Sequence, residues 1–309
     1  MERGKGIFLI ILGSILWGAT GPMMEWVLHN SEVTVSFFLT VRLIVAGMSI
    51  LIFLMLQRKK VFAIWKEPVW LKQLFIFAIL GMLGIQYTFI AAIEASNASI
   101  ATLLQFLGPI YIIMYVSWKG KVFPPKYQVI GIIGTLVGLF LLLTNAQIGG
   151  LLISNKALFW GLLLGIAFSI YTVYPARLMK EWGVLVVVGW GMLIGGIVLS
   201  TVSQIWNTSQ WNELLEYPNI IFVVLIIFMG TIAFVMFLSS MKYITAVETS
   251  ILSSIEPLTA MIISVFWFNQ ILGFWQYIGV VVMLLFVTWL SVAGDVNLDS
   301  LKKLKKRRG

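Results

Sequence analysis

The chain has 309 residues, of which 60% are apolar and 11% are charged, and its mean hydropathy is +1.00. Soluble domains carry charge on about a quarter of their residues, so this composition excludes an ordinary soluble protein and indicates one that lies in a lipid bilayer. The formal net charge of +9 is explained by short basic loops and a basic C-terminal tail, and we expect no nucleic-acid partner. The absence of cysteine excludes disulfides, Cys-ligated metals and thiol catalysis.

Ten apolar stretches follow one another along the chain. Each is close to the roughly 20 residues that a helix needs to cross the hydrocarbon core of a bilayer. The stretches are continuously apolar, without the period of two that a transmembrane β-barrel shows. We therefore predict an all-α membrane protein with ten transmembrane helices. The expected ranges are 7–28, 33–56, 73–93, 98–118, 127–144, 157–178, 184–203, 219–240, 246–267 and 274–293.

Lysine and arginine predict the orientation of these helices. If the N-terminus is cytoplasmic, 19 of the 21 basic residues fall on the cytoplasmic side, and only Arg42 and Lys156 do not. This distribution follows the positive-inside rule. We expect both termini in the cytoplasm and a multi-pass protein of the cell membrane, the inner membrane if the cell is bacterial. The basic tail, residues 297–309, is expected to contact anionic lipid.

An internal repeat relates the two halves of the chain by a shift of 148 residues. It predicts a first repeat at 1–148, a second at 149–296 and a tail at 297–309. Because each repeat has five helices, an odd number, the second repeat enters the membrane from the opposite side to the first. Inverted repeats of this kind are typical of secondary transporters. The matched residues are Ala98 and Ala246, Pro109 and Pro257, Gln128 and Gln276, and Gly131 and Gly279.

Two charged residues are expected near the middle of the membrane, Arg42 and Glu256. Each costs several kcal/mol there unless it is paired or faces a wet cavity. They are either a fixed ion pair that orients two helices or cavity-facing groups that contact substrate or carry a proton. Glu25 and Glu94 stand near the outer ends of their helices, where solvation at the interface is the simpler interpretation. With a single histidine in the chain, we expect no histidine metal site and no cofactor.

Pro109 and Pro257 occupy matched places within the stretches 98–118 and 246–267. A proline inside a helix removes one backbone donor and crowds the preceding turn. Each is therefore either a passive kink or a hinge beside a binding site. Glu256 stands next to Pro257, and its counterpart in the first half is Gly108.

Several aromatic and polar residues are expected at membrane depth. A single buried aromatic residue is usually a packing or interface residue, whereas a buried amide requires a partner that lipid does not provide. As a set they indicate a cavity whose aromatic walls could hold an amine by cation–π contact, while Arg42 could hold a carboxylate. The candidate substrate-binding residues are Trp17, Arg42, Gln86, Tyr87, Gln105, Tyr171, Trp190, Ser253 and Glu256.

Glycines four residues apart indicate close helix packing. We expect these contacts within the subunit more than between subunits, and the sequence predicts no oligomeric state. The pairs are Gly134 and Gly138, Gly161 and Gly165, and Gly191 and Gly195.

Short motifs follow one another in order along the chain: Gly13-Ser-Ile-Leu-Trp17-Gly18, Arg42-Leu-Ile-Val-Ala46-Gly47, Ala91-Ala-Ile with Ser96-Asn97-Ala98, Pro109, and Gln128-Val-Ile-Gly131 with its copy Gln276-Tyr-Ile-Gly279. In this order the chain resembles the EamA repeats of the drug/metabolite transporter superfamily. The resemblance implies ten helices, cytoplasmic termini and transport, often export, of small metabolites such as amino acids. It also implies a central cavity, for which Trp17, Gln86, Gln105, Tyr171 and Glu256 are candidates.

The leading hypothesis is a secondary transporter that alternates access about Pro109 and Pro257, with Glu256 as the candidate for proton coupling. The chain has no phosphate-binding Gly-x-x-x-x-Gly-Lys motif, so ATP hydrolysis is not expected. Facilitative uniport, exchange and channel-like conduction stay open as alternatives. An intramembrane enzyme would need paired acids, a Ser/His couple or metal ligands at one depth, and we expect no enzymatic activity.

Overall fold

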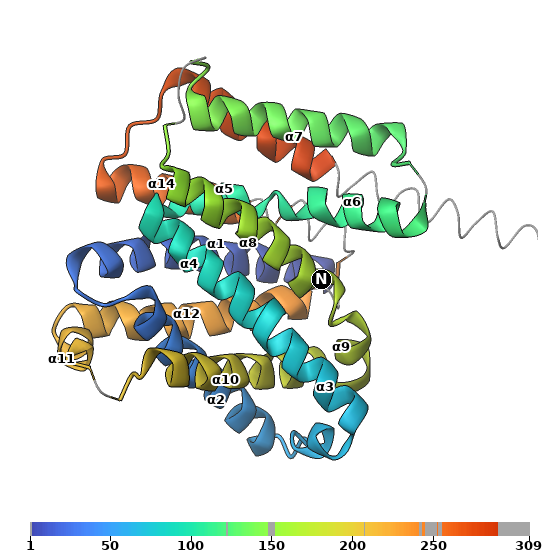
Figure 1. The fold of residues 1–309 in the computed structure, drawn as a ribbon, viewed down its shortest axis with the longest axis vertical. Helices are drawn as coiled ribbons and strands as arrows, with labels where there is room; N and C mark the ends of the chain where they lie inside the picture. The colour runs from blue at the N-terminus through green and yellow to red at the C-terminus, as the bar shows by residue number, and fades with distance from the viewer. Residues whose placement is uncertain are drawn as a thin grey trace, which may run out of the picture. The chain divides into compact units, whose positions relative to one another are not determined.

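The computed structural model describes residues 2–121, 123–147, 152–206, 208–240, 243–244, 252 and 255–289, and every regular element in this part is helical. The predicted all-α fold class is confirmed for these residues. The elements, shown in Figure 1, are α1 (Glu2–Asn30), α2 (Val35–Leu56), the 3-10 helix η1 (Ala63–Lys66), α3 (Pro68–Ile76), the π-helical segment η2 (Phe77–Leu83), α4 (Gly84–Ala95), α5 (Ala98–Gln105), α6 (Gly108–Gly120), α7 (Lys126–Thr144), α8 (Asn155–Val173), α9 (Ala176–Trp182), α10 (Val184–Ser203), α11 (Gln210–Leu215), α12 (Asn219–Ser240), α14 (Ile255–Phe268) and the last described helix (Phe274–Trp289).

Among the described residues, seven helical stretches are long and apolar enough to cross a membrane. Three further apolar helices have 10–17 residues. Each of the ten predicted ranges overlaps one of these helices. The seven are Arg3–Asn30, Val35–Leu56, Pro68–Ala95, Ala98–Tyr115, Lys126–Thr144, Val184–Ser203 and Asn219–Phe237, and the three shorter ones are Asn155–Tyr171, Ile255–Phe268 and Phe274–Trp289.

Packing divides the chain into two units. Unit 1 comprises Met1–Ala19, Pro109–Ser154 and Ile232–Gly309, and unit 2 comprises Thr20–Gly108 and Asn155–Thr231. Three helical stretches, α1, α5–α6 and α12, pass from one unit to the other. Each unit therefore contains residues from both halves of the chain, and the repeat boundaries at 148 and 296 stay a prediction.

In unit 2, α2 and α10 lie side by side and cross at glycines (Figure 1). A Cβ added to Gly47 would lie 2.7 Å from the backbone nitrogen of Leu193 and 2.9 Å from the carbonyl oxygen of Gly189. One added to Gly196 would lie 2.7 Å from the side chain of Ile44. Residue numbers fall along α10 as they rise along α2, so the two helices are antiparallel. They are also repeat counterparts, because a shift of 148 residues superposes their ranges.

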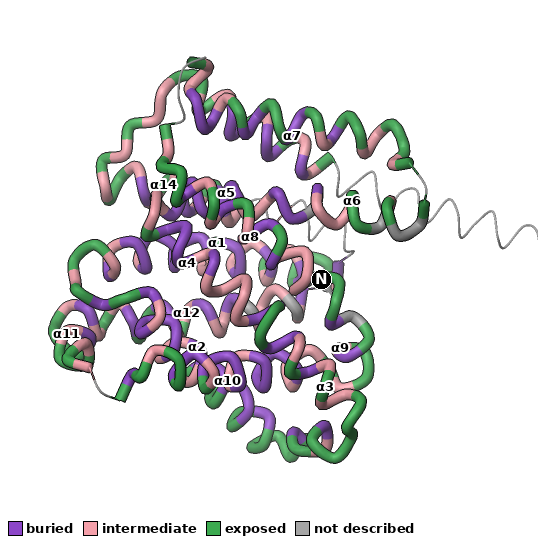
Figure 2. The backbone as a smooth tube through the Cα atoms, viewed as in Figure 1, coloured by how far each residue is buried: buried purple, intermediate pink, exposed green. Residues whose placement is uncertain are grey.

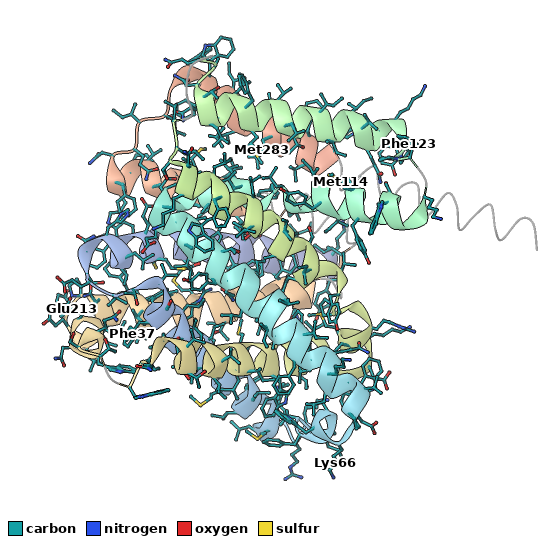
Figure 3. The ribbon with its side chains drawn as sticks, viewed as in Figure 1. Phe37, Lys66, Met114, Phe123, Glu213 and Met283 are labelled. Atoms are coloured by element: carbon teal, nitrogen blue, oxygen red, sulfur yellow. The ribbon has the colours of Figure 1, made fainter. Side chains whose placement is uncertain are left out.

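Unit 1 contains a second pair of the same kind, formed by α7 and the last described helix. A Cβ on Gly138 would lie 2.6 Å from the backbone nitrogen of Met283, and one on Gly279 would lie 2.6 Å from that of Leu142. Met283 lies between the two helices (Figure 3). This pair is antiparallel as well, and its members are again 148 residues apart.

The side-chain amide of Gln276 connects the ends of this second pair. Its Nε2 donates to the carbonyl oxygen of Leu142 at 2.9 Å, and its Oε1 accepts the N–H of Gly273 at 2.8 Å. The amide therefore satisfies a carbonyl in the last turn of α7 and an N–H just before the last described helix. Neither group has a partner within its own helix.

The described glycines of the four-residue pairs meet groups of their own unit. Gly134 and Gly161 face the side chains of Phe286 and Leu104, and Gly191 and Gly195 face η2. The prediction that these glycines pack within the subunit is confirmed for them.

The outward faces of the helices are apolar. Along α7 buried and exposed positions alternate around the helix (Figure 2). The buried positions include Gly131, Thr135 and Gly138, whereas the exposed ones carry large apolar side chains. An apolar surface of this extent is typical of a protein that is surrounded by lipid. The exposed residues of α7 are Val129, Ile130, Ile133, Leu136, Val137 and Phe140.

Candidate functional site

The helix predicted over 98–118 is interrupted just before its proline. α5 ends at Gln105 and α6 begins at Gly108. The amides of Phe106 and Leu107 bond to carbonyls three residues back, at 3.1 and 3.0 Å, and Pro109 has no N–H to continue the regular ladder. The predicted kink is therefore a break, and it coincides with the boundary between Gly108 of unit 2 and Pro109 of unit 1.

Ser169 of α8 lies beside this break. Its hydroxyl oxygen is 3.0 Å from the carbonyl oxygen of Gly108 and 2.9 Å from that of Gly165, and the single hydroxyl proton serves one acceptor at a time. A Cβ on Gly108 would collide with the ring of Phe168. The first residue of α6 therefore has to be a glycine for α8 to approach this closely.

The helix predicted over 73–93 contains a feature that the sequence did not indicate. Between α3 and α4, η2 winds as a π-helix, which is rare and is often found at functional sites. Its Phe77 ring stacks on the ring of Tyr171, with centroids 5.8 Å apart. A Cβ on Gly81 would lie 3.5 Å from the Cα of Tyr171, so η2 packs closely against α8 and fixes the position of this predicted site residue.

Two further predicted residues lie one turn along, in α4. The ring of Tyr87 meets that of Trp160 edge-on, with centroids 5.7 Å apart. The side-chain amide of Gln86 is 4.0 Å from the sulfur of Met82, which is a weak acceptor. Gln105, the last residue of α5, forms no side-chain hydrogen bond with a described residue. Both amides therefore keep most of their hydrogen-bonding capacity.

These residues share one helix interface. The pairs Phe77–Tyr171 and Tyr87–Trp160 both join the η2–α4 stretch to α8 within unit 2. Phe77 and Trp160 were not among the predicted site residues, because a phenylalanine or tryptophan in an apolar helix looks the same whether it packs against lipid or against a neighbouring ring.

Arg42 lies elsewhere in unit 2, where α2 meets α1 and α12. Its Nη1 is 3.6 Å from the sulfur of Met24, and a Cβ on Gly230 would lie 3.6 Å from its Nη2. Within this unit it pairs with no described carboxylate. Arg42 belongs to unit 2 and Glu256 to unit 1, and an ion pair between them stays a prediction.

Trp190 of α10 packs against aromatic residues of the connection between α2 and α3. It is 8% exposed, and its indole N–H donates to the carbonyl oxygen of Val61 at 2.8 Å. The rings of Phe62 and Trp65 lie 5.4 and 4.9 Å from its ring. The indole donor is thus used by the backbone, and a contact between Trp190 and substrate stays a prediction.

The interpretation of Glu25 as a solvated interfacial residue is wrong. Glu25 is 3% exposed, and its Oε2 accepts the N–H of Ala98 at 2.7 Å. Asn97 accepts another backbone N–H of the same turn at 2.8 Å, so two acceptors cap the start of α5, where negative charge is favourable. Glu94, by contrast, is exposed and lies 3.1 Å from the ammonium of Lys156, as an interfacial residue would.

In unit 1, α1 packs against α12 and α14. The ring of Trp17 lies 5.2 Å from that of Phe237. A Cβ on Gly18 would collide with the carbonyl oxygen of Glu256 and lie 2.7 Å from the side chain of Thr259, so the backbones of α1 and α14 touch. Glu256 and Pro257 are the second and third residues of α14. The structure thus places the ring of Trp17 against α12 and the backbone of Glu256 against Gly18, the next residue of α1.

Two predictions fall outside the described residues, namely Ser253 and the basic tail at 297–309. Within the described ranges, no group of three or more His, Asp or Glu residues is placed to hold a metal ion.

Known proteins resemble this chain in sequence and in fold. The model of the EamA-like transporter family matches residues 4–144 and again residues 155–292. The uncharacterized inner membrane transporter YicL of Salmonella typhimurium is 30% identical over 290 residues, which cover 93% of this chain and 95% of the relative. An uncharacterized transporter of Synechocystis is 26% identical over 295 residues, covering 88% and 85%. A solved crystal structure at 17% identity has a TM-score of 0.62 over 94% of this chain and 98% of its own length, and so shares the fold.

Proposed function

We propose, from the premise that this chain belongs to the EamA-like transporter family, that it is a secondary active transporter of a small metabolite that works by alternating access. Membership makes the chain a multi-pass membrane protein and a transporter, and it confirms the resemblance to the drug/metabolite transporter superfamily. Family and relatives indicate transport rather than catalysis.

The observation that carries the proposal is the antiparallel packing of repeat counterparts. In unit 2, α2 pairs with α10, and in unit 1, α7 pairs with the last described helix. Counterparts that run in opposite directions are what an inverted repeat requires, and inverted repeats are typical of alternating-access transporters. This supports ten membrane-spanning helices in two inverted groups of five.

The points where the chain passes between units support movement of one unit against the other. The chain passes from one unit to the other at four points: within α1 at Ala19–Thr20, at Gly108–Pro109, at Ser154–Asn155, and within α12 at Thr231–Ile232. The three points that fall inside helical stretches are at or next to a glycine or proline, whereas Ser154–Asn155, just before α8, is not. We assign Pro109 as a hinge on this basis. Pro257 lies inside unit 1, and its hinge role is proposed from the repeat alone.

The charge distribution supports cytoplasmic termini. The name of the Salmonella relative supports a bacterial inner membrane, where the basic tail at 297–309 would meet anionic lipid.

We propose an amino acid or a related amphipathic compound as the substrate, with export as the direction. The paired aromatic rings along α8 and the two amides with spare capacity support an amphipathic ligand. The substrate-binding residues of the proposal are Trp17, Arg42, Gln86, Tyr87, Gln105, Tyr171, Trp190, Ser253 and Glu256.

Flux through purified protein in liposomes tests the transport cycle. A carrier should show saturable uptake of labelled amino acid that is accelerated by unlabelled substrate on the opposite side. Facilitative uniport or exchange would proceed without response to an ion gradient, and channel-like conduction would show neither saturation nor acceleration. The last result would contradict alternating access.

Proton coupling is assigned to Glu256, the acidic residue whose backbone meets α1 at Gly18. Replacing Glu256 by Gln removes the titratable group and retains its size. We expect transport by this variant to lose its response to an imposed pH gradient, while Glu181→Gln, at an exposed position of α9, responds as the wild type does. Proton dependence that survives in Glu256→Gln would rule out this role.

A further inference from the structure

The guanidinium of Arg42 has an unusual environment. One nitrogen lies 3.6 Å from the sulfur of Met24, and the other faces Gly230, whose missing side chain leaves that side open. No described carboxylate of unit 2 lies within ion-pair distance. Glu25, next to Met24 in the chain, gives its carboxylate to the N–H of Ala98. Within unit 2 the guanidinium thus has a thioether as its polar contact and no described carboxylate as a partner.

The depth of this cation makes the lack of a carboxylate partner within its unit costly. Gly230 stands halfway along α12, a helix of 22 residues, so the guanidinium lies away from the ends of the helices, where headgroups and water would solvate it. A charged group in the hydrocarbon region costs several kcal/mol unless it is paired or hydrated. A thioether is a weak acceptor and offsets little of this cost.

We propose that Arg42 binds the carboxylate of the transported substrate, in a site bounded by Met24 and Gly230. The inference rests on the proposed function and names the chemical class of its substrate. The planar guanidinium presents five N–H donors in a fork that matches a carboxylate with two parallel hydrogen bonds. Gly230 places no side chain beside Nη2, and Arg42 is partly exposed, so a ligand can reach the guanidinium. The low dielectric at this depth strengthens such a pair.

A purely structural role for Arg42 makes a different prediction. If the arginine held the fold together, its replacement by Met, which is apolar and of similar length, would lower the unfolding temperature. If it serves a ligand, the unliganded protein carries an unpaired charge in apolar surroundings, and Arg42→Met keeps or raises the unfolding temperature. A fall of several degrees in Arg42→Met would overturn the proposal.

Ligand binding is tested by thermal unfolding of the full-length protein in detergent. The probes are L-phenylalanine, L-leucine and L-threonine, each compared with its primary amide and its decarboxylated amine. We expect the acids to raise the unfolding temperature of the wild type and the amides and amines to do so at least about tenfold less effectively. In Arg42→Gln the acids should no longer raise the unfolding temperature. In Arg42→Lys the affinity for the acids should fall by about tenfold, because an ammonium cannot form the bidentate pair.

Two matched variants control for charge and for space. Arg177→Gln removes an exposed arginine of α9 and should bind the acids as the wild type does. Gly230→Ala adds one methyl group at ordinary contact distance from Nη2. It should lower the binding affinity for the acids several-fold while leaving the unfolding temperature of the unliganded protein unchanged.

The results separate this inference from the transport proposal. Equal stabilisation by acids and amides, acid binding retained in Arg42→Gln, or no stabilisation by any acid would each overturn the carboxylate site. If acids bind through Arg42 but no flux occurs in liposomes, the site stands and the transport cycle fails. If amines are carried and Arg42→Gln carries them equally well, transport stands and the site fails.

Discussion

Glu25 connects two segments that are 73 residues apart through one hydrogen bond. Ala98, whose N–H it accepts, is completely buried, so this donor depends on an acceptor from the protein. An unpartnered buried donor costs about 1–3 kcal/mol. This carboxylate therefore fixes where α5 begins, and α5 leads into the break before Pro109.

We expect Glu25→Ala to lower the free energy of unfolding by about 2 kcal/mol, because it leaves the buried N–H of Ala98 without its acceptor while Asn97 still caps Ile100. Glu94→Ala is the matched control, since it removes an exposed carboxylate whose partner is also exposed and should cost roughly 0.5 kcal/mol or less. Thermal unfolding in detergent compares them. Equal losses in the two variants would contradict the capping role.

Only some of these residue roles could be predicted from the sequence. Arg42 and Glu256 are recognisable because a charge inside an apolar run is visible without any structure. The role of Glu25 is not, since its position near a helix end suggests solvation and its partner is remote in the sequence. The same limit applies to Phe77 and Trp160, whose neighbours are set by tertiary packing.

Among the helices, the crossing of α2 and α10 depends on the absence of a side chain at Gly47. A Cβ there would approach backbone atoms of Leu193 and Gly189, which cannot move aside as a flexible side chain would. By helix propensity alone, replacing this glycine with alanine would stabilise α2 by about 1 kcal/mol. Overpacking of about 1–3 kcal/mol opposes this gain.

We therefore expect Gly47→Ala to lower the unfolding temperature. Gly4→Ala, at a site with nothing within 4 Å of the added Cβ, should leave the unfolding temperature unchanged or raise it. Both variants place the same substitution inside a helix, so thermal unfolding of the two reports on the crossing. A gain in stability for Gly47→Ala would show that the helices separate at no cost.

The helices themselves were largely predictable because lipid requires long apolar runs in which the backbone satisfies its own hydrogen bonds. The break at Phe106 and Leu107 was partly predictable from Pro109. The π-helical winding of η2 was not, because the same apolar residues serve an α-helix or a π-helix, and packing against Tyr171 and α10 accompanies it.

For the molecule as a whole, the orientation in the membrane is open to a direct test. Because the chain has no cysteine, single cysteines can be introduced without removing any. We expect a membrane-impermeant maleimide to label Ser209→Cys on intact cells and to label Lys60→Cys only after the cells are opened. Both positions are exposed. Labelling of Lys60→Cys on intact cells would reverse the orientation and place the termini outside.

The antiparallel glycine crossings also bear on biosynthesis. α2 is made long before α10, and α7 long before the last described helix, since each pair is separated by 148 residues. Until those later helices emerge from the ribosome, the glycine faces of α2 and α7 have no native partner and are open to other membrane helices. Insertion of the first half into the membrane and its final packing are therefore separated in time. A truncated translation product would keep the glycine faces of α2 and α7 without partners, and cellular quality control could recognise them.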